Sequence, residues 1–326
     1  MHDRNTTMRR AAACLILAAA AFGAQAQEYP AKPVRVLVGV PPGGVTDLAA
    51  RLVLPRVAET LGQTFVIENR PGAIGSLAGR VVATAPADGY TLLMGSSADM
   101  AIGPSLLRDL PHDTQKDFTG VAPVSSTAMT ISAHPSLPAN TIPELIRLAK
   151  AKPGSLAYAS AGNGTVNHIV GEWFKNVAGV SITHVPYRGG GPATQDLLAG
   201  QVPLGMIAVS NATPLVKAGK LKVLAVTSGK RVPFQPDWPT VAEAGFPDFH
   251  ATVWVALFAP AGTPREVIAR LNREVNAALK LPEIRERFNT QGAEVTGGSP
   301  EDLNNLLRDD AARYARLIQQ FGIKVD

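Results

Sequence analysis

The stretch VRVLVGVPPGGVTD, residues 34–47, joins a short strand pattern to a glycine turn and the start of a helix. The β-branched run 34–40 is typical of a buried strand. Gly43 and Gly44 let the backbone approach a ligand closely, and a helix that opens near Asp47 presents N–H groups with no partner of their own. Helix ends of this kind bind anions. The stretch therefore predicts an α/β fold whose first strand-to-helix turn can hold a negatively charged group.

A second stretch repeats this arrangement further along the chain. The run 156–159 predicts a strand, SAGNGT at 160–165 supplies glycines and hydroxyl groups, and residues 166–177 follow with a helical pattern. An ordinary connecting loop remains the alternative for either turn taken alone. Because open α/β sheets bind ligands at the carboxyl ends of their strands, two such turns favour a ligand site at that edge.

Short β-branched runs alternate with helical patterns from residue 33 onward, which indicates βαβ units with parallel sheets flanked by helices. The runs expected to be strands are 34–40, 65–68, 91–94, 121–124, 156–159 and 184–187. Capping-box spacing predicts helix starts at Thr141, Thr240, Thr263 and Ser299. Pro55 falls within the helical pattern 47–61 and should kink or break that helix.

The length of the chain, 326 residues, exceeds what one hydrophobic core usually fills, so we expect two lobes. The segments 121–134 and 252–260 are long and extended, as strands that pass between lobes would be. With these two hinge crossings, residues 27–124 and 251–326 should form lobe 1, and residues 125–250 should form lobe 2.

The first residues have the pattern of an export signal. Arg9 and Arg10 precede the apolar run 11–22, and Ala24-Gln25-Ala26 offers a cleavage site after Ala26. The apolar run is too short to span a bilayer, which needs about 20 apolar residues. We therefore expect a periplasmic protein that is cleaved near Ala26.

Composition narrows the classes of function. The chain carries 31 Lys and Arg against 26 Asp and Glu, and loss of Arg4, Arg9, Arg10 and Asp3 with the signal leaves 28 against 25, a net charge of +3. The basic residues are scattered singly, which argues against a nucleic-acid partner and is compatible with a small anionic ligand. Cys14 lies in the signal, so the mature chain has no disulfide and no thiolate ligand.

Further polar residues follow other predicted strands. Ser97 and Ser210 follow two further strand patterns, and the stretch 184–191 adds a third turn with Tyr187 and Arg188, where Arg188 could bind a carboxylate in a fork. The six histidines are dispersed, so we expect no metal site and no cofactor. We expect ligand contact from Pro42, Gly43, Gly44, Thr46, Asp47, Ser97, Ser160, Ala161, Gly162, Gly164, Thr165, His168, Tyr187, Arg188 and Ser210.

Several phrases of the sequence carry a resemblance to a known family: YP at 29–30 with VR at 34–35, PPGG at 41–44 with Asp47, ENRPGA at 68–73, DGYTLL at 88–93, YAS at 158–160, HVPY at 184–187, LAVTS at 224–228, PTVAEAG at 239–245 and APAGTP at 259–264. With these phrases in this order and spacing, the sequence is similar, over nearly its whole mature length, to the Bug-type receptors of tripartite tricarboxylate transporters. The similarity implies a two-lobe, type II periplasmic-binding-protein fold. It also implies that the turn 41–47 and the turn 160–165 hold a ligand carboxylate between them, partly through water.

Such a receptor captures a small carboxylate in its interlobe cleft, as a monomer, and delivers it to the permease subunits of a membrane transporter. Two departures from the family pattern bear on the ligand. Val40 stands where an aromatic residue usually precedes the PPGG turn, and Pro203 stands where an aspartate is common. A smaller side chain at position 40 should widen or reshape the pocket.

Two other functions remain open from the sequence. A receptor that signals to a membrane sensor would use the same ligand chemistry. A secreted hydrolase would need Ser160 or Ser97 as nucleophile with His168 as base. The chain lacks the G-x-S-x-G, phosphate-loop, dinucleotide and H-E-x-x-H motifs, so we expect no enzymatic activity.

Overall fold

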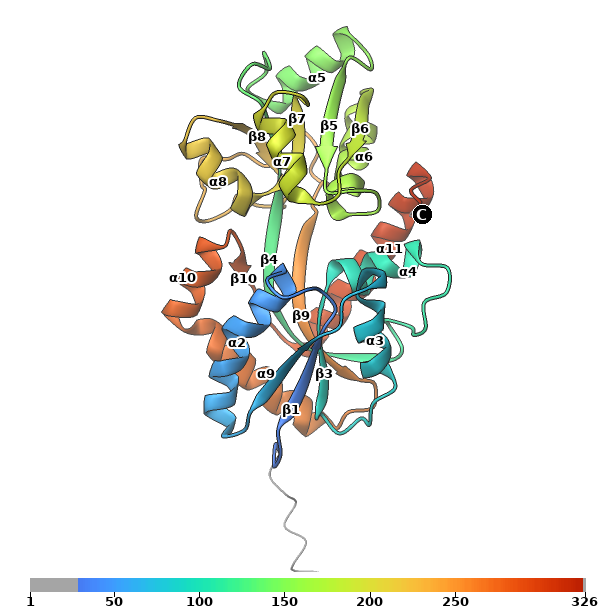
Figure 1. The fold of residues 1–326 in the computed structure, drawn as a ribbon, viewed down its shortest axis with the longest axis vertical. Coiled ribbons are helices and arrows are strands. Elements are labelled where there is room, and N and C mark those ends of the chain that lie inside the picture. The colour runs from blue at the N-terminus through green and yellow to red at the C-terminus, as the bar shows by residue number, and fades with distance from the viewer. Residues whose placement is uncertain (1–28, 325–326) are drawn as a thin grey trace, which may run out of the picture.

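The computed structural model describes residues 29–324, so the predicted export signal and its cleavage site lie outside the described residues. The described chain forms two sheets, one below the other in Figure 1, each flanked by helices. We use lobe 1 for the part around the lower sheet, which contains β1, and lobe 2 for the part around the upper sheet, which contains β5. No helix among residues 29–324 is long and apolar enough to cross a bilayer.

The sheet of lobe 1 has the strand order β2-β1-β3-β9-β4-β10. β1 pairs in parallel with β2 and β3, whereas β9, β4 and β10 each run antiparallel to a neighbour. The carboxyl ends of β1 and β3 point up toward lobe 2 (Figure 1). The strands are β1 (Val34–Val38), β2 (Phe65–Asn69), β3 (Thr91–Ser96), β4 (Phe118–Ala133), β9 (Thr252–Pro260) and β10 (Glu294–Val295).

The sheet of lobe 2 has the order β6-β5-β7-β4-β8. β5 pairs in parallel with β6 and β7, and β4 runs antiparallel to β7 and β8. β5 points down toward lobe 1, so the carboxyl edges of the two sheets face each other (Figure 1). The additional strands are β5 (Leu156–Ser160), β6 (Ile182–Pro186), β7 (Leu204–Ala208) and β8 (Lys222–Val226).

β4 belongs to both sheets. Its residues 118–128 pair with β9 in lobe 1, and its residues 129–133 pair with β7 and β8 in lobe 2. The buried Thr227 ties this strand to the return crossing, because its hydroxyl accepts the N–H of Met129 at 3.0 Å and donates to the carbonyl of Ala251 at 2.7 Å. The division of the chain at 124/125 and 250/251 stays a prediction: β4 continues through the first boundary, and β9 begins two residues after His250.

Helices cover both sheets and bury two main apolar cores. One core lies between the sheet of lobe 1 and the helices α2, α9 and α10, and it contains Val36, Val53 and Leu271. The other core runs from lobe 1 into lobe 2 along α11, where Trp254 donates its indole N–H to Asp310 at 2.7 Å.

The α-helices are α2 (Val45–Leu61), α3 (Ser76–Ala83), α4 (Gly103–Leu106), α5 (Ile142–Ala151), α6 (Val166–Ala178), α7 (Gly190–Leu198), α8 (Val209–Lys217), α9 (Arg265–Lys280), α10 (Pro282–Thr290) and α11 (Pro300–Phe321). Short helices η1 (Ala73–Gly75) and η2 (Ala98–Ile102) complete the set.

Several local predictions need correction. The sheets are mixed rather than parallel, because a chain that crosses between lobes and returns must run antiparallel to itself. Thr263 does not cap a helix, since its hydroxyl donates to the carbonyl of Pro260 at 2.8 Å and α9 follows Pro264. Thr240 and Glu243 make the reciprocal bonds of a capping box around a turn instead of a helix. α2 is one continuous helix through Pro55.

Candidate functional site

The turn between β1 and α2 is held together by a buried carboxylate. The side chain of Asp47 is 1% exposed and accepts hydrogen bonds from the N–H of Gly43 at 2.8 Å, the amide of Asn69 at 2.8 Å and Nε of Arg51 at 2.9 Å. Burial alone would raise the pKa of Asp47, but the bonds from Arg51, Gly43 and Asn69 bring that pKa below its usual value. Asp47 therefore supports the turn and keeps its charge.

Gly44 precedes α2, and its N–H donates to the carbonyl of Pro41 at 3.1 Å. A Cβ at Gly44 would lie 2.8 Å from Cγ2 of Val40, so glycine is needed for this close approach. Because the first turn of a helix supplies no acceptor for its own N–H groups, those of Val45 and Thr46 have no partner within α2.

The turn between β5 and α6 is held by neutral groups. Ser160 is fully buried, its Oγ lies 2.6 Å from Nε2 of His184, and the same Oγ accepts the N–H of Gly162 at 3.1 Å. The N–H of Gly164 donates to Nδ1 of His168 at 3.2 Å. Four of the predicted ligand residues, Ser160, Gly162, Gly164 and His168, therefore bond to the protein itself in this structure.

α6 begins with a side-chain cap. Oγ1 of Thr165 accepts the N–H of His168 and donates to the carbonyl of Gly162 at 2.7 Å. The amides that stay unpaired by the helix are therefore those of Val166 and Asn167. The Asn167 side chain donates to the carbonyl of Met206 at 2.6 Å and contacts Sδ of Met129 at 3.5 Å, so the first turn of α6 reaches β4 and β7.

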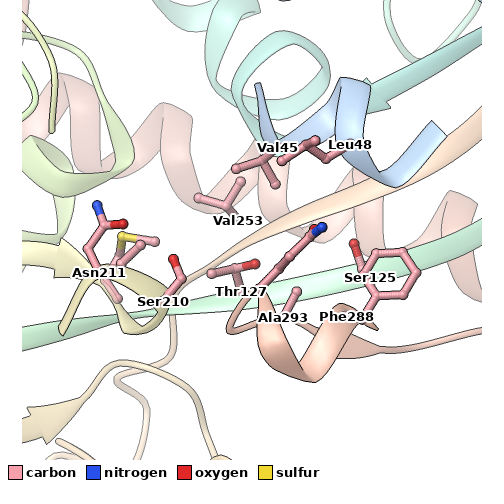
Figure 2. Close-up of a pocket in the computed structure, with 12 residues that line it drawn as sticks. Val45, Leu48, Ser125, Thr127, Ser210, Asn211, Val253, Phe288 and Ala293 are labelled. Carbon is pink, nitrogen blue, oxygen red and sulfur yellow. The ribbon is translucent and has the colours of Figure 1, made fainter. Parts of the chain in front are cut away.

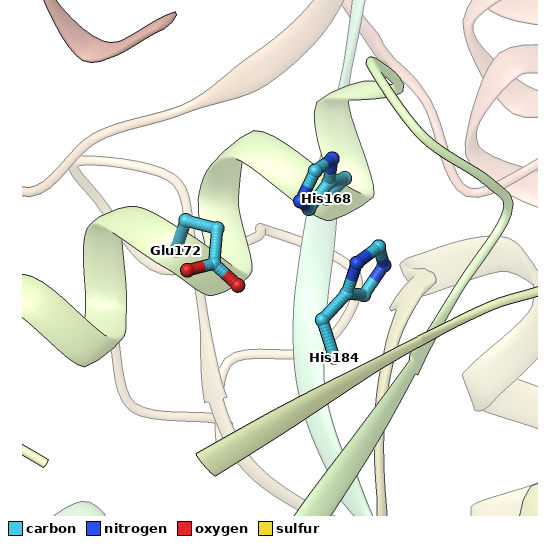
Figure 3. Close-up of side chains that lie close together, drawn as sticks. All are labelled: His168, Glu172 and His184. Atoms are coloured by element: carbon cyan, nitrogen blue, oxygen red, sulfur yellow. The ribbon is translucent and has the colours of Figure 1, made fainter. Parts of the chain in front are cut away.

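His168, Glu172 and His184 lie close together (Figure 3), and their possible metal-ligand atoms are all within 4.8 Å of one another. The two imidazole rings stack with centroids 3.9 Å apart and planes at 8°, so a single ion could not lie in both ring planes, where the nitrogen lone pairs point. Glu172 already binds Lys175 at 2.6 Å and accepts the Tyr158 hydroxyl at 2.8 Å. In this arrangement the cluster braces the turn and does not form a metal site.

Both histidines are neutral in this environment. Burial lowers the pKa of His184 to about 4, and the neighbouring His168 lowers it further. Burial also lowers the pKa of His168. The hydrolase alternative paired Ser160 with His168, but the partner of Ser160 is His184, and the serine hydroxyl is sealed from solvent. A fully buried hydroxyl beside a weakly basic imidazole is not a nucleophile open to a substrate.

The other predicted residues lie in different places. The Tyr187 hydroxyl donates to Asp196 at 2.7 Å, and burial followed by this bond raises the pKa of Tyr187 to about 12. Arg188 is exposed. The carbonyl of Ala161 accepts the N–H of Gly189 at 3.1 Å, and Pro42 is exposed on the first turn. Ser97 is buried, with no hydrogen-bond partner for its hydroxyl among the described residues.

A cavity of about 320 Å³, which we call the interlobe cavity, lies between the two lobes (Figure 2). Val45 and Leu48 line it from the first turns of α2, and Ser210 lines it from the start of α8. Of these three, only Ser210 is a predicted ligand contact. The other lining residues come from segments far apart in the chain and carry no shared motif. These residues are Ser125, Thr127, Met129, Ala208, Asn211, Val253, Phe288, Gln291 and Ala293.

A second cavity, of about 280 Å³, lies within lobe 1 beside the first turn, and we call it the lobe 1 cavity. Thr46 of α2 and Ser96 of β3 line it, as does Asp99, which sequence reasoning passed over although it follows the third strand by three residues. The remaining lining residues are Gly39, Val40, Pro41, Pro71, Gly72, Ile74, Gly75 and Ala98. The first turn of α2 thus borders both cavities, with Val45 on one and Thr46 on the other.

Pro203, the second departure from the family pattern, lies just before β7, and its carbonyl accepts the N–H of His134 at 3.0 Å. This is the amino end of the strand, opposite the carboxyl edge where the turns gather. Val40, the first departure from the family pattern, lines the lobe 1 cavity.

Comparison with known proteins identifies the fold and the family. Residues 49–323 match the model of the tripartite tricarboxylate transporter family receptor, TctC. The protein BugT of Bordetella pertussis is 35% identical over 324 residues, which cover 98% of this chain and 99% of that protein.

Two solved structures extend the similarity to three dimensions. The Rhodopseudomonas palustris protein Rpa4515, solved with adipate, is 37% identical with a TM-score of 0.77, covering 91% of this chain and 99% of that one. MatC of Rhodopseudomonas palustris, solved with bound malate, is 35% identical with a TM-score of 0.73, covering 89% and 100%. The two-lobe periplasmic-binding-protein fold predicted from the sequence is confirmed, and the chain belongs to the receptor family of tripartite tricarboxylate transporters.

Proposed function

We propose that this receptor binds the carboxylate of a small organic acid between the first turns of α2 and α6 and carries it to the permease subunits of a tripartite transporter. The observation that carries the proposal is the facing pair of glycine turns, one at the edge of each sheet. Each turn is braced by its own side chains, and each leaves helix N–H groups unpaired. The adipate and malate bound by the two relatives support a carboxylate as the ligand.

The contacts of the two first turns support one shared site. Asn167 at the start of α6 contacts Met129, and Met129 lines the interlobe cavity together with Val45 at the start of α2. A helix end stabilises a nearby anion by about 0.3 to 1 kcal/mol, and each hydrogen bond to a charged group contributes roughly 1.5 to 3 kcal/mol. Two helix ends with three such bonds give roughly 5 to 11 kcal/mol, a range that includes the roughly 8 kcal/mol of micromolar binding.

The proposal extends to the export of the protein, its oligomeric state and the delivery of its ligand. The chain is exported through the signal at residues 1–26, is cleaved near Ala26 and acts as a monomer. Ligand closes the lobes about the crossings at β4 and β9, and the permease binds the closed form. Sequencing the amino terminus of the protein from the periplasmic fraction tests the export step, and an uncleaved or cytoplasmic protein would contradict it.

A thermal-shift screen tests the ligand class, because a ligand that binds only the folded state raises the melting temperature. The panel contains mono-, di- and tricarboxylates, including adipate and malate, with amino acids, aromatic acids and matched amides of the same acids. We expect at least one carboxylate to raise the melting temperature while its amide does not. Equal shifts for acid and amide would contradict recognition of the carboxylate.

A receptor that signals to a membrane sensor would pass the same screen. A pull-down with the ligand-loaded protein separates the two outputs, because transport requires capture of permease subunits. Capture of a sensor kinase without a permease would replace the transport step of the proposal and leave ligand binding intact.

A further inference from the structure

The lobe 1 cavity contains an acidic side chain that the family resemblance does not assign. Asp99 lies in η2, and its Oδ1 accepts both the N–H of Ser96 at 2.6 Å and the Ser96 hydroxyl at 2.5 Å. Ser96 engages only Oδ1, which leaves Oδ2 available to a donor that enters the cavity. Asp99 is the only ionisable side chain among the residues that line this cavity.

Two glycines make room for this carboxylate. A Cβ at Gly75 would lie 2.9 Å from Cβ of Asp99, and a Cβ at Gly95 would lie 3.2 Å from its Oδ2. Ile74, which also lines the cavity, has a φ of 53°. That conformation is unusual for a β-branched residue, and such outliers cluster at ligand sites. The backbone around Asp99 is thus fitted closely to the acid.

Val40 sets the size of the space in front of Asp99. It lines the same cavity, and its side chain packs against Gly44 of the first turn. An aromatic side chain, usual at this position in the family, would occupy more of this volume. The cavity therefore joins a site for a carboxylate, at Thr46 and the start of α2, to a second group of opposite character at Asp99.

We propose that Asp99 selects the ligand: the group that enters the lobe 1 cavity is a hydrogen-bond donor, a hydroxyl or an ammonium, and a second carboxylate is disfavoured there. The proposal rests on the proposed function, in which the other end of the ligand is a carboxylate. A carboxylate beside Asp99 would face a like charge with no basic side chain among the lining residues, whereas a hydroxyl or ammonium would donate to Oδ2. The preferred ligands are short hydroxy or amino carboxylates.

The raised pKa of Asp99 supports this assignment. Burial raises that pKa to about 6, against the lowering effect of the two bonds from Ser96 and of one from the N–H of Asp99 itself. Near pH 7 the group is mostly ionised and only partly compensated, so it gains from a donor supplied by the ligand. No other titratable group lines the cavity to share that role.

The test is calorimetry at pH 7.5 with four five-carbon acids that differ only in the distal group: valerate, 5-hydroxyvalerate, 5-aminovalerate and glutarate. We expect wild-type protein to bind the hydroxy or the amino acid about tenfold or more tightly than glutarate, the usual effect of a bond to a charged group. The variant Asp99→Asn keeps an acceptor for Ser96 and places an amide donor toward the cavity, so its preference should move to glutarate. Asp309→Asn, on the exposed face of α11, is the control for loss of one charge.

The outcomes separate the two proposals. Equal affinity of wild type for all four acids, or an unchanged preference in a folded Asp99→Asn, would overturn the role of Asp99 while carboxylate binding stands. No binding of any of the four acids by wild type, with no carboxylate active in the thermal-shift screen, would overturn both. Whether the hydroxyl or the ammonium binds more tightly decides which donor the cavity takes.

Discussion

The two strand-to-helix turns have the same sequence pattern and similar shape but are braced by different chemistry. In lobe 1 the turn closes on the ionised carboxylate of Asp47, whose charge is balanced by Arg51. In lobe 2 the turn closes on the hydroxyl of Ser160 and the neutral rings of His168 and His184. A glycine turn supplies free amides only if other groups hold it in place, and charge and neutral hydrogen bonds can each do so.

The difference matters for an anionic ligand. Asp47 places a negative charge next to the proposed anion site, and its bonds to Arg51 and Asn69 offset that charge. The turn of lobe 2 carries no net charge from its bracing groups. We therefore expect the loss of the bracing side chain to reduce stability and binding more in lobe 1 than in lobe 2. We expect the stability of the lobe 2 turn to be the more sensitive to mild acid.

The largest expected effect is that of Asp47→Ala. The substitution leaves the N–H of Gly43 and one side of Arg51 without their partner, so we expect the free energy of unfolding to fall by about 2 to 4 kcal/mol and ligand binding to be lost. Urea unfolding measures the first and calorimetry the second. Asp309→Ala, which removes an exposed partner of Arg308, should change stability by less than about 0.5 kcal/mol. A similarly small effect at Asp47 would mean that charge does not brace this turn.

A smaller loss is expected from Ser160→Ala in lobe 2. Nε2 of His184 and the N–H of Gly162 each lose a buried partner, which should lower the free energy of unfolding by roughly 1 to 3 kcal/mol. Binding should weaken as well, because the turn loosens. Ser155→Ala removes an exposed hydroxyl of the same lobe and serves as the control. Weaker binding with unchanged stability would instead make Ser160 a direct ligand contact.

The smallest expected effect is a difference between the two turns in how their contribution to stability depends on pH. The pKa of His184 is lowered to about 4 in the folded protein, so the unfolded chain binds the extra proton first and stability falls as pH drops from about 6.5 toward 4. Asp47, whose pKa is also lowered, keeps its contribution until pH falls below the usual range of an aspartate. Asp99 acts in the opposite direction, because its raised pKa makes the folded protein gain stability as pH falls through about 6.

The comparison of wild type with His184→Gln isolates the turn of lobe 2. The stability advantage of wild type should shrink by roughly 1 to 2 kcal/mol between pH 7 and pH 4.5 when unfolding is followed by urea titration. An advantage that stays constant over this range would show that the imidazole does not brace the turn as a neutral group.

The sequence predicted the turns better than it predicted their internal bonding. Glycine spacing and strand patterns located 41–47 and 160–165, because such turns depend on local backbone requirements. The bond between Ser160 and His184 joins residues that are 24 positions apart in the sequence, and the pairing of β5 with β6 brings them together. A local sequence pattern therefore could not predict it. The interlobe cavity likewise needs α10, whose place beside α2 follows from the return of the chain to lobe 1. Asp99 was the one omission that local reading could have repaired, since it follows a predicted strand.

The central claim is that helix ends from both lobes hold one carboxylate. The most direct measurement is a titration of isotope-labelled protein with the acid that gives the largest thermal shift, followed through the backbone amide resonances. We expect the amides of Val45 and Thr46 in lobe 1 and of Val166 and Asn167 in lobe 2 to shift most, and to saturate together at one equivalent. Shifts confined to one lobe, or largest around Phe288 and Gln291 in the interlobe cavity with the helix ends unmoved, would contradict the claim.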